Sequence, residues 1–167
     1  PEAAALGFRR LILAAAIQMS LPGVPCVYYG DEAGMSGMSD PYNRAPYPWG
    51  RENAALLEAY RRLGGARASR EALKTGRLRM GALHEDVFCA LRFTEDPAEA
   101  ALLFVNRGSA GQTVSLAPAR LREGPDGETP ADLRGVWIDV LSGETLASGD
   151  TMTLQLPPLT ARLYLKA

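Results

Sequence analysis

The chain has few of the features that mark disulfide-rich, membrane-spanning or nucleic-acid-binding proteins. Its 167 residues include only two cysteines, Cys26 and Cys89, which are too few for a disulfide framework. We expect both to be free thiols buried in strands, as in a reducing compartment, and we predict a cytoplasmic protein. The longest uninterrupted apolar run, Leu11–Ile17, is far shorter than the ~20 residues of a membrane span, so no membrane partner is expected.

Charged clusters and residues that could bind a metal or a phosphate are also few. The formal net charge is −1 and no like-charge run occurs, which argues against a nucleic-acid partner. The only histidine, His84, falls in a predicted hairpin turn, His84-Glu85-Asp86, where we expect it to be exposed and inert. One histidine and two separated cysteines lack metal-ligand spacing, and no glycine-rich loop precedes a lysine to hold phosphate. The sequence therefore predicts no metal site and no cofactor.

The first third of the chain predicts a helix, a buried strand, a long loop and a second helix. Residues 2–20 are apolar on nearly every side, which is typical of a buried helix, and a Leu-Pro-Gly sequence ends it. The run Val24–Tyr29 is typical of a parallel strand covered on both faces. Arg51–Leu63 fits a second helix that ends at a pair of glycines. Because a parallel strand needs parallel neighbours, we expect those of Val24–Tyr29 to lie outside this chain.

After Gly76 the hydrophobic period changes to two, which is typical of half-buried strands. Short turns rich in glycine, proline and aspartate separate these strands, so we predict an antiparallel β-sandwich over residues 76–167, behind a unit over residues 1–75. Arg120–Leu133 is expected to be a loop. The strands are predicted from the alternating sets Leu78, Met80, Ala82; Val87, Cys89, Leu91, Phe93; Met152, Leu154, Leu156; Ala161, Leu163, Leu165; and from Ala101–Val105, Thr113–Leu116 and Val136–Leu141.

The segment Gly30–Gly50 is the most informative part of the chain. Structureless loops longer than ~12–15 residues are uncommon and are usually functional or disordered, and this one is too aromatic for a disordered linker. It follows the carboxyl end of the predicted parallel strand, where barrel enzymes build their sites. Aromatic faces stack on sugar rings, and carboxylate–arginine pairs bind vicinal hydroxyls, so the composition suits a carbohydrate. The side chains concerned are Asp31, Glu32, Asp40, Tyr42, Arg44, Tyr47 and Trp49.

Several motifs carry a resemblance to a known family. The run PGVPCVYYGDE, residues 22–32, resembles the G-x-P-x-x-x-Y-G-D/E-E segment on the last barrel strand of glycoside hydrolase family 13, the α-amylase family. The continuation GM, DPYNR and PYPW resembles a pattern nearest the neopullulanase, cyclomaltodextrinase and maltogenic amylase group. Gly50 departs from that group, which usually has an acidic residue after the tryptophan. Residues 70–76 (REALKTG), 105–107, 141–144 and 157–165 resemble the link into domain C and its strands.

This resemblance implies a fold and an activity. The fold would be the last helix-strand-helix portion of a (β/α)8 TIM barrel, incomplete over residues 1–75, followed by an all-β antiparallel sandwich, domain C. The chain would be a C-terminal fragment of a retaining α-glucan-acting glycoside hydrolase that cleaves α-1,4 bonds in maltodextrins, cyclodextrins or pullulan. Its partners would be the α-glucan oligosaccharide and the missing N-terminal barrel portion. The family's catalytic carboxylates lie on earlier strands, so no catalytic residue is expected in the fragment, which should be inactive alone. Calcium is possible in the parent enzyme but is not supported by this segment.

The resemblance also assigns substrate-binding residues. Asp40 and Arg44 match positions that line the donor-side sugar subsites, although a salt bridge that only shapes the loop is an equal alternative, and both can hold. Tyr42 and Trp49 are weaker candidates for sugar contact. Together with Tyr47, they are expected to act more as packing residues than as stacking platforms.

At the barrel mouth, Tyr29, Gly30, Asp31 and Glu32 are expected to structure the loop. Asp31 and Glu32 are adjacent, so in an extended segment they would point to opposite sides and would not form a catalytic pair. Contacts with backbone groups and arginines are the expected role of these two carboxylates.

Three alternatives stay open at this level. The parent could be an α-glucosidase or a glucosyl-transferring isomerase of the same family. The chain could instead be a non-enzymatic β-sandwich glucan-binding module, but its sandwich aromatics, Phe88, Phe93, Phe104, Trp137 and Tyr164, lie in strand patterns and are expected in the core. Because helix 2–20 would expose apolar surface without a complete barrel, we also expect a homo-oligomer through that surface.

Overall fold

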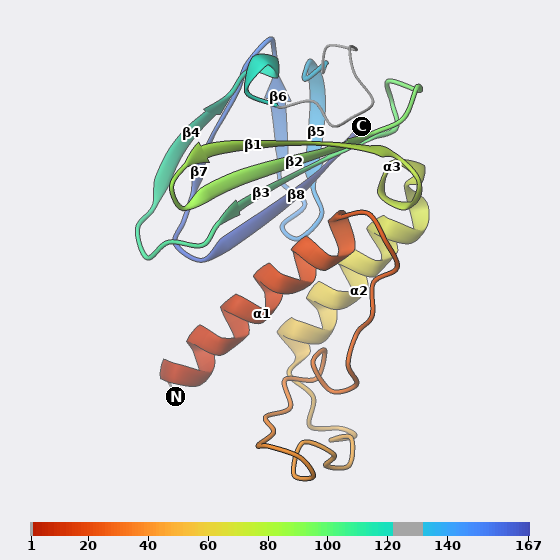
Figure 1. Ribbon diagram of the computed structural model, residues 1–167, viewed down its shortest axis with the longest axis vertical. Helices are drawn as coiled ribbons and strands as arrows, with labels where there is room; N and C mark the ends of the chain where they lie inside the picture. Colours follow the sequence, from red (N-terminus) through yellow and green to blue (C-terminus); the bar gives the residue numbers. More distant parts are fainter. Residues whose placement is uncertain (1, 122–131) are drawn as a thin grey trace.

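The computed structural model describes residues 2–121 and 132–167 and runs from helices to strands along the chain (Figure 1). The loop expected at Arg120–Leu133 falls largely outside these residues. The helices are α1 (Glu2–Ser20), α2 (Ala54–Ser69), α3 (Glu71–Lys74) and the 3₁₀ turn η1 (Pro118–Arg120). The strands are β1 (Arg77–His84), β2 (Val87–Phe93), β3 (Ala100–Asn106), β4 (Gln112–Leu116), β5 (Gly135–Asp139), β6 (Thr145–Ser148), β7 (Met152–Leu156) and β8 (Thr160–Lys166).

The strands form two antiparallel sheets, so the predicted antiparallel strand pairing is present. One sheet has six strands in the order β1-β2-β3-β8-β5-β6, and the other pairs β4 with β7. The alternation in β7 predicts its burial correctly, since Met152, Leu154 and Leu156 face the core. Between the sheets lies one apolar core, with Cys89, Phe104, Trp137 and Tyr164 among its members.

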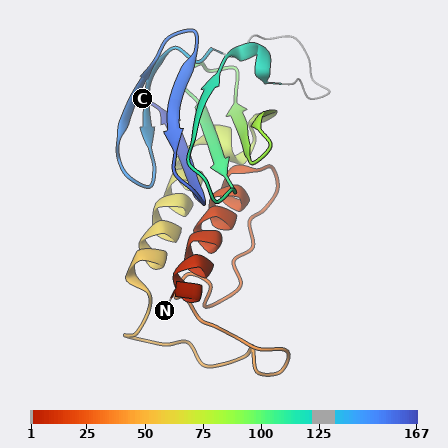
Figure 2. The same cartoon turned by 90° about the vertical axis from the view of Figure 1, so that its left-hand side faces the viewer.

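The helices cover the other face of the six-stranded sheet. Helices α1 and α2 lie side by side beneath it in both views (Figures 1 and 2). A second apolar core joins them to the sheet and contains Leu63 and Ala66 of α2 together with Leu103 and Leu163 of the sheet. Strand β3 is therefore buried on both faces, in keeping with its continuous apolar run, whereas half-buried strands were predicted for this part of the chain in general.

The edge strand β1 departs from its predicted burial. Leu78, Met80 and Ala82 were expected on the core face, but Arg79 and Gly81 are buried while Met80 is 41% exposed. A backbone carbonyl of Arg120 stands within 2.6 Å of where a Cβ on Gly81 would lie, so η1 covers β1 at a position that only glycine fits. The residues that bury this face of β1 belong to a turn distant in the chain, so the alternation within β1 could not predict which face is buried.

Helix α1 is less buried than its composition predicted. It ends at Ser20, as expected, but only Ala15, Ala16, Met19 and Ser20 are buried, because the described elements contact mainly its C-terminal half. By length and composition, α1 is also the one helix among the described residues that could cross a membrane; a core helix or a signal sequence passes the same test.

Helix α2 begins later than the predicted Arg51, at Ala54 after the Asn53 cap, and continues past the predicted end through Gly64 and Gly65 to Ser69. Leu63 and Ala66 on either side of the glycines are buried in the second core. Tertiary packing thus outweighs the low helix propensity of a glycine pair.

Val24–Tyr29 does not form a strand in this structure. The segment is extended but pairs with no described strand, and Val24 is 95% exposed. A strand requires a neighbour for its backbone hydrogen bonds, and none of the described elements provides one. Cys26 is consequently exposed, which contradicts its predicted burial, whereas Cys89 is buried as predicted, and both are free thiols.

Candidate functional site

The loop predicted to carry the site begins with a compact turn. The Gly30 carbonyl accepts hydrogen bonds from the amides of Ala33 (3.1 Å) and Met35 (2.9 Å). The Glu32 carboxylate turns back and accepts the Gly30 amide at 2.9 Å, so its expected contact with the backbone is present. Gly30 has a φ of 95°, and a Cβ there would collide with the Met35 side chain, so glycine is required.

Asp31 and Glu32 form a local patch of negative charge beside two tyrosines. Partial burial and the Glu32 carboxylate raise the pKa of Asp31. Burial, with the charges of Asp31 and Glu32, raises the pKa of Tyr60 to about 12, and desolvation and Glu32 raise that of Tyr47. Among the described residues, no arginine forms an ion pair with either carboxylate, so that part of the expectation is not met.

Both ends of the loop are attached to the helices. The Asn53 amide donates to the Ala33 carbonyl at 2.9 Å, and the Asn53 side chain accepts the Leu56 amide at 3.1 Å and so caps α2. Gly34 lies against Leu56, Asn53 and the Phe8 ring of α1. The loop therefore starts and ends on a fixed base while its tip extends away from the sandwich (Figure 1).

Asp40 and Arg44 lie together at the tip of the loop. The Arg44 Nε donates to Asp40 Oδ1 at 2.9 Å, and the two side chains are 69% and 61% exposed. An ion pair this exposed contributes only ~0–1 kcal/mol to stability. The structure therefore shows the salt bridge, which was one of the two alternatives for these residues. This bridge leaves most of the hydrogen-bonding capacity of both side chains open to solvent.

Two aromatic side chains of the loop are more exposed than predicted. Tyr42 is 73% and Trp49 80% exposed, so neither is buried, although the Trp49 ring contacts that of Tyr47. Tyr47 and Trp49 have ring centroids 4.6 Å apart at an interplanar angle of 51°. The Tyr29 hydroxyl donates to the Ala45 carbonyl at 3.0 Å and ties the start of the loop to this stretch. The loop thus exposes both aromatic ring faces and a charged pair.

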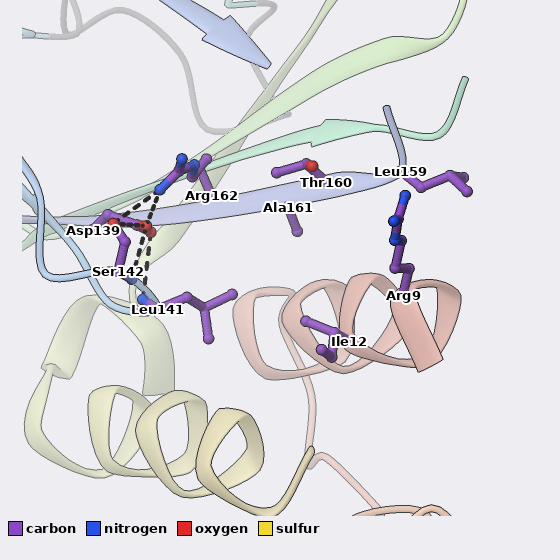
Figure 3. Close-up of a pocket in the computed structure, with 9 residues that line it drawn as sticks. All are labelled: Arg9, Ile12, Asp139, Leu141, Ser142, Leu159, Thr160, Ala161 and Arg162. Atoms are coloured by element: carbon purple, nitrogen blue, oxygen red, sulfur yellow. Dashed lines mark hydrogen bonds and ion pairs between the residues drawn. The ribbon is translucent and has the colours of Figure 1, made fainter. Parts of the chain in front are cut away.

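A cavity of about 260 Å³ lies elsewhere, between α1 and β8 (Figure 3). At one end the fully buried Asp139 carboxylate accepts the Ser142 hydroxyl at 2.7 Å and Arg162 Nη1 at 2.8 Å. At the other end Arg9 and Ile12 of α1 face β8. The polar groups at the Asp139 end bond one another, so we assign this cluster to folding rather than to ligand binding.

His84, Glu85 and Asp86 bring potential metal-ligand atoms within 4.8 Å of one another at the turn between β1 and β2. His84 is exposed, as predicted. Asp86 is already engaged, because its carboxylate pairs with Arg107 at 3.2 Å and its amide donates to His84 Nδ1 at 3.3 Å. These three residues carry no functional assignment.

Comparison with known proteins identifies the relatives of this chain, although no family model matches it. It is 35% identical to an amylopullulanase of Thermoanaerobacter thermohydrosulfuricus over 87% of its length, and 33% identical to neopullulanase 2 of Thermoactinomyces vulgaris over 79%. It is 29% identical to a cyclomaltodextrinase of Geobacillus thermopakistaniensis over 93%. The chain spans 10%, 21% and 25% of the length of these curated relatives.

Solved structures agree with this relationship. An Anoxybacillus α-amylase superposes with a TM-score of 0.77 at 26% identity over 95% of this chain and 32% of its own. The cyclic α-maltosyl-(1→6)-maltose hydrolase of Arthrobacter globiformis gives 0.64 at 31% identity over 92% of this chain and 30% of its own. Together with the motifs of the Gly30–Gly50 loop, these matches show that the chain belongs to the α-amylase family, glycoside hydrolase family 13, beside amylopullulanases, cyclomaltodextrinases and neopullulanases.

Proposed function

We propose that the protein containing this chain is a retaining α-glucan hydrolase that cleaves α-1,4 bonds in maltodextrins, cyclodextrins or pullulan. The carrying observation is that a chain related to amylopullulanase, cyclomaltodextrinase and neopullulanase presents a loop with an exposed ion pair and exposed aromatic side chains. In this proposal residues 1–75 are the end of the catalytic TIM barrel and residues 76–167 are domain C. The substrate partner is an α-glucan oligosaccharide.

The bond-breaking groups are proposed to lie outside this chain. Retention requires two carboxyl groups ~5–5.5 Å apart, one as nucleophile and one as acid and base. Asp31 and Glu32 are adjacent, and Glu32 is bound to its own turn through the Gly30 amide. We therefore propose that they shape the barrel mouth, together with Tyr29 and Gly30, and that the chain alone does not hydrolyse glucan.

The role proposed for Asp40 and Arg44 is to hold the donor-side sugar. Their 2.9 Å bridge orients a carboxylate and a guanidinium side by side, which suits two neighbouring hydroxyls of one glucose unit. Trp49 and Tyr42 add exposed ring faces in the same loop and are proposed as secondary contacts. Sugar binding would compete with water at these groups rather than break a buried network.

The binding-module alternative loses support, because the sandwich offers no exposed aromatic platform among its described residues. Trp137, Phe104 and Tyr164 are buried, while Phe88 and Phe93 are half-buried against the cores. An α-glucosidase or isomerase has no specific observation in its favour.

The exposed half of α1 is the surface proposed to meet other protein. Leu6 is 37% exposed there, and the extended segment Val24–Tyr29 adds Val27 and Tyr28 at 38% and 51%. We propose that the remaining barrel of the same protein covers this surface, and that the chain on its own associates through it into homo-oligomers. A cytoplasmic location remains a prediction.

A chimera tests the sugar-binding role. The matched quarter of the Geobacillus thermopakistaniensis cyclomaltodextrinase is replaced by this chain, and cyclomaltodextrin hydrolysis is measured. Asp40→Ala and Arg44→Ala are each expected to lower kcat/KM by about 10- to 100-fold, the loss of a charge-assisted hydrogen bond of ~1.5–3 kcal/mol.

Arg134→Ala is the matched control, because Arg134 forms an equally exposed ion pair with Asp150 on the sandwich, far along the chain from the loop. It should leave kcat/KM unchanged. Loop variants that behave like this control would remove Asp40 and Arg44 from the site.

A further inference from the structure

Four carbonyl oxygens where α1 ends are held by only two arginines. Arg67 of α2 donates Nη1 to the carbonyls of Met19 (2.9 Å) and Leu21 (3.2 Å), and Nη2 to that of Gly23. Arg92 of β2 donates Nη1 to the carbonyl of Ser20 at 2.8 Å. Carbonyls at a helix C-terminus lack intrahelical partners and carry the negative end of the helix dipole, so two cations are well placed there.

Arg92 also connects this point to the start of the sandwich. Its Nη2 and Nε donate to the carbonyl of Gly76, at 2.8 and 3.3 Å, just before β1. The side chain is 1% exposed, and none of the described carboxylates forms an ion pair with Arg92 or Arg67. Burial and the neighbouring charge of Arg67 lower the pKa of Arg92, which is consistent with two guanidinium groups sharing one cluster of carbonyls.

The chain just beyond this cluster has few other attachments. Val24–Tyr29 has no strand partner among the described residues, and Gln18 Nε2 to the Cys26 carbonyl, at 2.7 Å, is the one side-chain bond seen to its backbone. The next fixed point is the turn at Gly30, which starts the candidate loop. The path from α1 to the loop is therefore set by side-chain donors rather than by a β-ladder.

We propose that Arg67 and Arg92, which we call the clamp, are positioning residues for the candidate site. They fix the backbone that leaves α1, so that α2 and the sandwich together determine where the Gly30–Gly50 loop stands. The meaning of that loop as a sugar contact rests on the proposed function, whereas the positioning itself does not. Arg67 needs its guanidinium for this role, because its bonds to the three carbonyls come from two separate nitrogens, whereas an ammonium group has all its donors on one nitrogen.

Spin labels test the clamp without any sugar. The exposed Cys26 takes one nitroxide and Thr145→Cys on β6 takes the other, while Cys89 is buried and should stay unlabelled. Double electron–electron resonance then reports how sharply Val24–Tyr29 is held relative to the sandwich. Arg67→Ala is expected to broaden the distance distribution by roughly twofold or more, because the segment loses its attachment and moves independently. Adding guanidinium far below denaturing concentrations should narrow the distance distribution of Arg67→Ala again. The added ion can reach the vacated position because Arg67 is only partly buried.

Arg62→Ala is the matched control. Arg62 also lies on α2 and donates to a distant carbonyl, that of Leu141 at 2.8 Å, but it does not touch the exit from α1. The distance distribution of Arg62→Ala should stay as narrow as that of the parent chain. If Arg67→Ala unfolds the chain, Arg67→Lys is used instead and should give an intermediate width.

Two results overturn the clamp: a distribution in the Arg67 variants as narrow as in the parent, or equal broadening with Arg62→Ala, which would indicate general loosening. The experiment contains no glucan, so its outcome does not depend on whether Asp40 and Arg44 bind sugar.

Discussion

Replacing Trp137 with alanine is expected to lower the free energy of unfolding by about 3–5 kcal/mol. Trp137 is 0% exposed at the centre of the core between the two sheets, and its Nε1–H donates to the Leu133 carbonyl at 2.9 Å. The variant loses the burial of the largest side chain in that core, leaves a cavity, and strands a buried carbonyl without its donor. Urea unfolding followed by circular dichroism measures the change.

Val136→Ala is the control, since Val136 is the preceding residue on β5 but is 46% exposed, and it should change stability by less than about 0.5 kcal/mol. Because domains are stable by only ~5–15 kcal/mol, Trp137→Phe provides a milder second variant, with an expected loss of about 1–3 kcal/mol. A Trp137→Ala variant as stable as Val136→Ala would mean that this core is not packed as described.

The second large effect is expected at the buried Asp139–Arg162 pair. Asp139 has a fully buried side chain, accepts Arg162 Nη1 at 2.8 Å and receives two more bonds from the Ser142 amide and hydroxyl (Figure 3). Arg162→Met removes the counter-charge and leaves a buried carboxylate with only neutral donors. Breaking a buried pair costs about 3–5 kcal/mol, and because Arg162 itself is 22% exposed we expect about 2–4 kcal/mol here.

Arg134→Met provides the comparison. Arg134 and Asp150 approach even more closely, at 2.6 Å, but their side chains are 71% and 80% exposed, so the loss should be only ~0–1 kcal/mol. In the double variant Asp139→Asn with Arg162→Met, part of the stability should return, because no buried charge remains. Equal losses at the two pairs in urea unfolding would show that burial does not decide their strength.

The sequence predicted best those features that depend on local pattern. Period two in Met152, Leu154 and Leu156 predicted the burial of β7, and the Leu-Pro-Gly stop predicted the end of α1. The Gly30 turn and its Glu32 contact followed from a motif whose residues are adjacent in the chain.

Features that depend on distant partners could not be predicted in this way. Val24–Tyr29 has the composition of a buried strand, but composition does not supply the neighbouring strand it would need. The glycine pair in α2 predicts a helix end, and only the burial of Leu63 and Ala66 against the sheet explains why the helix continues. Met80 is exposed because the cover on β1 comes from η1, forty residues further on.

The clamp and the buried pair were missed for the same reason. Arg67 and Arg92 lie in a helix and a strand whose patterns show only that each is a charged residue among apolar ones. The phase of the pattern was a signal only for Asp139, which alternates with the core residue Trp137 on β5. A charge at such a position indicates a partner but does not identify it. Arg92 falls between Leu91 and Phe93 of the predicted core set, so the alternation placed it on the solvent face, and its burial comes from the elements that cover the other face of β2.

A hydrolysis assay on the purified 167-residue chain, run beside the cyclomaltodextrinase chimera with maltodextrin, cyclomaltodextrin and pullulan, tests most directly whether the bond-breaking groups lie outside this chain. We expect no release of reducing sugar by the chain alone and measurable release by the chimera. Turnover by the isolated chain would contradict it, because the bond-breaking carboxylates would then have to lie among these 167 residues.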